Sequence, residues 1–211
     1  MERDEFGRSM IEMLGVLAIV GILSVGAISG FQKAMFKYRL QKMTEEYNMF
    51  FQDTLKYYKE LIALRRGLKP GEGEHYLIAE LLYNMGIVPS VWRQSGIYIY
   101  DRLNNKIKSF IRRETNTLNF DINLTADDTS IFVCEAIYRD VFMQFADNLY
   151  YVDIWRKNSE DQASSAYTRY GNLYCNKTIR KCVRDMTLTD IRKACSVCAQ
   201  DDKICVMLIN F

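Results

Sequence analysis

The residues with the clearest capacity for chemistry are six cysteines in the C-terminal part of the chain. All of them follow residue 130: Cys134, Cys175, Cys182, Cys195, Cys198 and Cys205. An even number of cysteines gathered in one region indicates disulfide bonds formed in an oxidising compartment. Zinc binding is the main alternative, but the spacing includes only one of the two close pairs that a zinc ribbon uses.

Local geometry favours one set of disulfide pairs, although the sequence leaves the others open. Two favoured pairs are Cys175–Cys182 across a turn and Cys198–Cys205 between an expected helix at 189–199 and the last strand. The two cysteines left over would then form the third pair, Cys134–Cys195. A redox function of the Cys-Ser-Val-Cys motif is disfavoured, because the pair falls at the end of that helix, where the helix dipole does not stabilise a thiolate.

The remaining composition gives no support for an enzyme, a metal site or a nucleic-acid-binding protein. His75 is the only histidine, and we expect it to be a solvated loop residue. No glycine-rich phosphate loop, G-x-S-x-G or H-E-x-x-H motif occurs. The 211 residues include 28 Lys and Arg against 26 Asp and Glu, and a net charge of +2 is no direct evidence for nucleic acid. We therefore expect no catalytic residues, no cofactor and no bound metal.

An uncharged segment from Met13 to Phe31 is long enough to cross a membrane. As a helix it would extend over about 28 Å, close to the thickness of a bilayer core. A buried core helix is one alternative, but it would normally carry a polar stripe, and this segment has only small residues among its apolar ones. A signal peptide cut after Ala27 is disfavoured, because residues 1–8 contain three acidic residues where that class is basic.

Glu12 lies at the edge of this apolar segment, where a carboxylate is costly and indicates a function. The run Gly7-Arg8-Ser9-Met10-Ile11-Glu12-Met13-Leu14, with the apolar segment behind it, resembles the cleavage and methylation motif of type IV pilins and type II secretion pseudopilins. The resemblance implies that a prepilin peptidase cuts after Gly7 and methylates the new N-terminus at Arg8. Glu12 then corresponds to the glutamate at the fifth mature position.

The resemblance also implies a location and partners. The precursor would reside in a bacterial inner membrane with its globular part in the periplasm. Inner-membrane assembly machinery would then join it to copies of itself and to other pilins in a filament at the cell surface. A helix places residues 8 and 12 on one face, so the new amine can pair with Glu12 in its own chain or in a neighbouring subunit. The second pairing would fix the register of packed helices.

Charge and cysteines give opposite predictions for topology. Lys33, Lys37, Arg39 and Lys42 follow the apolar segment, and the positive-inside rule alone would place the C-terminal part in the cytoplasm. Disulfides would not persist there. We expect the globular part to lie outside the cytoplasm.

The rest of the chain predicts a long helix followed by a mixed domain. Residues 1–7 form the leader, 8–66 one helix with an amphipathic second half over 32–66, and 67–211 the globular part. Within that part, the patterns predict a loop at 67–74, a helix at 76–85, a hairpin of strands at 97–100 and 106–111, a strand at 118–124, a helix capped by Asp127 or Asp128 and running to about residue 148, a strand at 150–155 and a loop at 158–165. Without βαβ alternation, this order favours an α+β fold: an antiparallel sheet packed on the long helix, with a disulfide-rich C-terminal region.

These observations favour a structural subunit of a type IV pilus-like filament. A pseudopilin of a type II secretion system is the nearest alternative. An unrelated extracytoplasmic domain on a simple membrane anchor is the other, and for it Glu12 would have no role.

Overall fold

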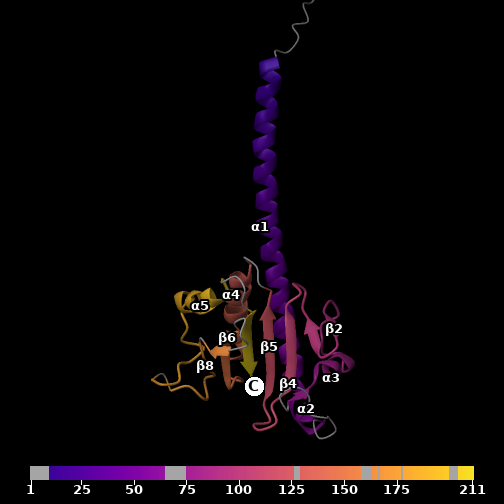
Figure 1. The fold of residues 1–211 in the computed structure, drawn as a ribbon, viewed down its shortest axis with the longest axis vertical. Coiled ribbons are helices and arrows are strands. Elements are labelled where there is room, and N and C mark those ends of the chain that lie inside the picture. Colours follow the sequence, from indigo (N-terminus) through magenta and orange to yellow (C-terminus); the bar gives the residue numbers. More distant parts are fainter. Residues whose placement is uncertain are drawn as a thin grey trace, which may run out of the picture. The chain divides into compact units, whose positions relative to one another are not determined.

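The computed structural model describes residues 10–64, 75–125, 129–157, 163–165, 167–176, 178–199 and 204–211. The chain divides into two compact units, residues 1–39 and 40–211. The first unit contains the start of helix α1 (Met10–Lys56). The second unit, which we call the head, contains the end of α1 and the other described elements (Figure 1).

The prediction of one helix over residues 8–66 is wrong at Tyr57. Helix α1 ends at Lys56, and a separate short helix, α2, covers Tyr58–Leu64. The amide of Tyr57 bonds to the carbonyl oxygen of Thr54 (3.2 Å), three residues back, which is a tighter turn than the α-helical one. Thr54 Oγ1 donates to the carbonyl oxygen of Phe50 (2.7 Å), and such a bond often bends a helix.

In the described part of the chain, nine strands form one antiparallel sheet, which confirms the expected α+β class. The strands are β1 (Tyr76–Leu77), β2 (Arg93–Ser95), β3 (Tyr98–Tyr100), β4 (Lys106–Ile111), β5 (Leu118–Leu124), β6 (Tyr151–Lys157), β7 (Ala163–Ser165), β8 (Arg169–Tyr170) and β9 (Ile204–Asn210). Their order is β2-β3-β4-β5-β9-β6-β7, with β1 paired to β4 and β8 to β6. The C-terminal strand therefore lies in the middle of the sheet (Figure 1).

Two predicted segments of the head have different boundaries in the structure. The helix expected at 76–85 is shorter, α3 (Ala79–Asn84), because Tyr76 and Leu77 pair with β4 as strand β1. The loop expected at 158–165 ends in strand β7, which pairs with β6 at the sheet edge. Residues 158–162 lie outside the described residues.

The middle helix is also shorter than predicted. It covers α4 (Ser130–Asp140), and a 3₁₀ helix follows at Phe142–Phe145. Asp127 and Asp128, the predicted caps, lie outside the described residues. Apolar residues that recur at helical spacing predict an inner face for this region. All five of them are buried: Cys134, Ile137, Val141, Phe145 and Leu149.

The last helix begins one residue earlier than predicted and is interrupted near its end. Helix α5 covers Leu188–Cys195, and a 3₁₀ helix continues over Ser196–Ala199. Thr187 and Asp190 cap α5 reciprocally: each side chain accepts a hydrogen bond from the other's backbone amide. This capping box satisfies two amides that the helix leaves without partners.

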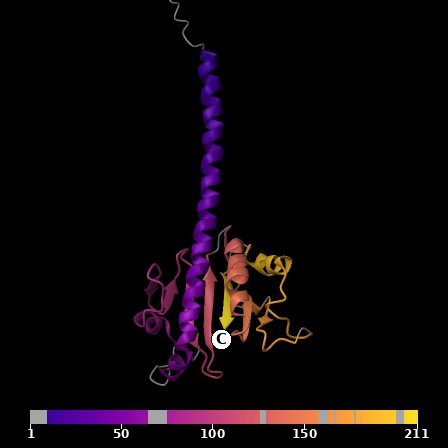
Figure 2. The same cartoon turned by 180° about the vertical axis from the view of Figure 1, so that it is seen from behind.

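The part of α1 within the head covers one face of the sheet (Figure 2). Phe50 and Phe51 of α1 contact Phe120 of β5, with ring centroids 5.5 and 5.2 Å apart. Side chains alternate along a strand, so residues 118, 120, 122 and 124 face α1, and residues 119, 121 and 123 face away from it. We call these the helix-covered face and the outer face of the sheet.

Candidate functional site

The first half of α1 exposes a continuous apolar surface. From Met13 to Phe31, its large apolar side chains are between 52% and 75% exposed. By length and composition this helix can cross a membrane. A surface of this size and apolarity is unfavourable in water, so lipid or other protein must cover it.

Glu12 is exposed in the first turn of α1. A carboxylate in this position interacts favourably with the partial positive charge of a helix N-terminus. The predicted processing residues Gly7 and Arg8 lie outside the described residues. Their pairing with Glu12 therefore stays a prediction.

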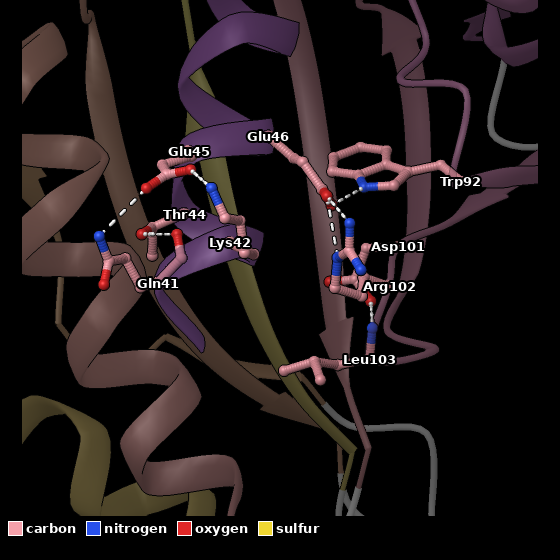
Figure 3. A network of polar contacts seen from close by, with 9 residues as sticks. All are labelled: Gln41, Lys42, Thr44, Glu45, Glu46, Trp92, Asp101, Arg102 and Leu103. Carbon is pink, nitrogen blue, oxygen red and sulfur yellow. Dashed lines mark hydrogen bonds and ion pairs between the residues drawn. The ribbon is translucent and has the colours of Figure 1, made fainter. Parts of the chain in front are cut away.

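A buried carboxylate on α1 anchors the helix to the sheet. Glu46 is 5% exposed and accepts hydrogen bonds from Trp92 Nε1 (2.8 Å) and Arg102 Nε (2.9 Å), with a further ion pair to the Arg102 guanidinium (Figure 3). Trp92 precedes β2, and Arg102 lies in the turn between β3 and β4. Glu46 therefore fixes α1 against two separate segments of the head.

Asp101 forms a second buried polar cluster beside the first. Its carboxylate accepts hydrogen bonds from Tyr47 Oη (2.9 Å), Asn105 Nδ2 (2.8 Å) and the backbone amides of Leu103 and Asn105 (both 2.8 Å). Burial raises the pKa of Asp101 from its usual value, and these four donors oppose that shift. The cluster holds the turn that positions Arg102.

The sequence does not predict either cluster, because the members of each cluster come from distant segments. One local signal was present. Glu46 lies in the apolar stripe formed by Met43, Tyr47 and Phe50, all of which are fully buried. An acidic residue within such a stripe requires a buried partner.

All six cysteines form disulfide bonds, in the pairs that local geometry favoured. The bonds are Cys134–Cys195, Cys175–Cys182 and Cys198–Cys205. No cysteine is free, so no thiolate is available for zinc binding or for dithiol chemistry. Cys134–Cys195 joins α4 to α5, and Cys198–Cys205 joins the last 3₁₀ helix to β9.

His75 lies in a loop, as predicted, but its side chain is only partly exposed. Its ring stacks on Phe110 of β4, with centroids 4.7 Å apart and planes 18° from parallel. His75 directly precedes β1, and pairing of β1 with β4 draws it onto the outer face of the sheet. Its Nδ1 atom is buried without a hydrogen-bond partner among the described residues.

Comparison with known proteins identifies no relative. No family model matches the chain, and no curated protein sequence and no solved structure matches it either.

Proposed function

We propose that this protein is a structural subunit of a type IV pilus-like filament. The subunit is made as a membrane-anchored precursor, cut after Gly7 and assembled through the apolar half of α1. Its head faces away from the cytoplasm. The function requires no catalytic residue, because assembly rests on helix packing and on one charge pair.

The exposed apolar surface of α1 is the observation that carries this proposal. Its large side chains between Met13 and Phe31 are all at least half exposed, whereas the head buries its own aromatic core. A bilayer covers such a helix in the precursor, and neighbouring helices cover it in a filament. A simple membrane anchor explains the first environment but gives no role to Glu12.

The disulfides support an extracytoplasmic head. Three disulfides in one head are typical of proteins that function in oxidising surroundings and outside the cell. They oppose the topology that the basic residues after the apolar segment would predict.

Assembly is tested with Glu12→Ala as the only copy in the native host. We expect this variant to fold, insert and keep its disulfides, because removal of a charge makes insertion easier. Filament yield should be lost, since the amine of the neighbouring subunit would be buried without a partner. Glu12→Gln keeps the shape without the charge and should also assemble poorly. Glu80→Ala, at an exposed position of the head, is the matched control and should give normal yield.

Processing is tested by N-terminal sequencing of the membrane-extracted protein. We expect a chain that starts at Arg8, and an uncut precursor in Gly7→Leu, because the peptidase must approach the backbone closely there. A wild-type chain that still starts at Met1, or full filament yield from Glu12→Ala, contradicts the proposal. Either result would favour the simple membrane anchor.

A further inference from the structure

The outer face of the sheet contains a pocket that the proposed function does not use. Its volume is about 410 Å³, within the usual range for small-molecule sites. Six of its lining residues carry the argument: His75, Lys108, Phe110, Arg112, Asp121 and Trp155. They come from four separate segments, and the sheet brings them together.

Strand register explains why these side chains meet. Lys108 on β4 lies directly opposite Asp121 on β5, and both follow the alternation that points away from α1. Arg112 continues the same alternation just beyond β4, and Trp155 is on the outer face of β6. His75 reaches this face through the pairing of β1 with β4.

Three polar groups of this pocket have buried atoms without a hydrogen-bond partner in the described part of the chain. They are His75 Nδ1, Arg112 Nε and Asp121 Oδ1. Burial raises the pKa of Asp121 to about 6, although Lys108 and Arg112 oppose the shift. Burial, together with the charges of Arg112 and Lys108, lowers the pKa of His75 from its usual value. Buried polar groups are normally paired, so these three atoms retain the capacity to hydrogen-bond to a group that enters the pocket.

The mixture of groups restricts the chemistry of that ligand. An ionised carboxylate only accepts hydrogen bonds, and a guanidinium only donates them. A simple anion would satisfy Arg112 but repel Asp121, and a simple cation would do the reverse. A hydroxyl group both donates and accepts, so a pair of neighbouring hydroxyls can bridge Asp121 and Arg112.

The aromatic lining adds a second restriction. Trp155 offers the pocket a large apolar ring, whose negative face attracts weakly positive C–H groups. The ligand therefore needs one apolar face and an edge of hydroxyl groups. A pyranose ring has both.

We propose that this pocket binds a saccharide, with a sugar ring against Trp155 and its hydroxyl groups between Asp121 and Arg112. Binding would give the head an adhesive function. It does not depend on filament assembly, so the two proposals fail separately.

The test applies the full-length protein, in a detergent without a sugar headgroup, to an array of immobilised bacterial and animal glycans. The free saccharide that corresponds to the strongest signal is then titrated calorimetrically. We expect saturable binding that the free sugar competes away. Sodium acetate supplies a simple anion and methylammonium chloride a simple cation. Neither salt should displace the bound sugar.

Substitutions assign the binding to the pocket. Trp155→Ala and Asp121→Asn should each weaken the affinity at least tenfold, whereas Trp155→Phe keeps a ring and should weaken it less. Asp53→Asn and Arg184→Gln, at exposed positions outside the pocket, are the matched controls and should bind as wild type does. Intact disulfides, checked by mass, and unchanged circular dichroism show that each variant folds.

Three results would overturn the proposal. The first is the absence of any glycan signal from folded wild-type protein. The second is glycan binding that the pocket substitutions leave unchanged. The third is displacement of the sugar by acetate or methylammonium, which would indicate an ion site.

Discussion

Removal of individual disulfides tests whether they stabilise the head by restricting the unfolded chain. Cys134 and Cys195 are 61 residues apart in the sequence, and Cys175 and Cys182 are 7 apart. The chain-entropy relation gives a stabilisation of about 4.3 kcal/mol for the long loop and about 2.4 kcal/mol for the short one. Replacement of the first pair by alanine should therefore cost about 2 kcal/mol more than replacement of the second.

The third disulfide provides a control for burial. Cys198 and Cys205 are also 7 residues apart, but both are buried, whereas Cys175 is half-buried. If loop length dominates, the Cys198→Ala/Cys205→Ala variant should lose about 2.4 kcal/mol, as the other short loop does. If packing dominates, it should lose clearly more.

The assay is urea unfolding of the full-length chain in detergent, followed through the fluorescence of the two tryptophans, of which Trp92 is 4% exposed in the core. Free energies of unfolding come from linear extrapolation, and intact protein mass confirms which disulfides remain. Equal losses for the long-loop and the short-loop pairs would refute the entropic argument. The stabilisation would then have to arise from contacts in the folded head.

Three further predictions concern single side chains. Gly171→Ala should destabilise the head by about 1 to 3 kcal/mol in the same assay, because a Cβ atom there would lie 1.9 Å from the carbonyl oxygen of Leu149. Glu46→Ala should cost about 2 to 3 kcal/mol, because Trp92 Nε1 loses its buried acceptor, and Glu46→Gln should cost less; equal urea midpoints for wild type and Glu46→Ala would contradict this. Asp121→Asn should stabilise the head at pH 7.5. The pKa of Asp121 is about 6 in the folded head and 3.8 in the unfolded chain, so the wild-type head loses stability as the pH rises from about 4 to above 6. The gain should be roughly 2 to 3 kcal/mol, and unfolding curves should show that it disappears at pH 4.

The sequence predicted the helices and strands whose own residues show a clear pattern of apolar and polar side chains. Strands β4 and β5 were predicted with the boundaries that the structure has. Residues 106–111 include two isoleucines and a phenylalanine, and residues 118–124 alternate between apolar and polar side chains. The inner face of the α4 region was predicted for the same reason. Its apolar residues recur at helical spacing.

The missed elements depend on pairing with distant segments. Strands β1 and β8 have two residues each, and β7 is the small polar run Ala163–Ser165, so none of them has a local pattern. The sequence did not predict the pocket for the same reason. Residues 75, 108, 112, 121 and 155 have no common spacing, and only the register of β4, β5, β9 and β6 brings them to one face.

Buried carboxylates on the two sides of the sheet differ in how many hydrogen bonds they accept. This difference allows a test of whether Asp121 has a structural role or a binding role. On the helix-covered side, Asp101 accepts four hydrogen bonds, so this chain can satisfy a buried carboxylate completely. On the outer face, Asp121 Oδ1 has no partner among the described residues, which costs stability. A purely structural residue should lose stability and binding together when it is replaced. For Asp121→Asn we expect opposite signs, with higher stability at pH 7.5 and weaker saccharide binding, because the charge that destabilises the folded head is the acceptor that the sugar needs.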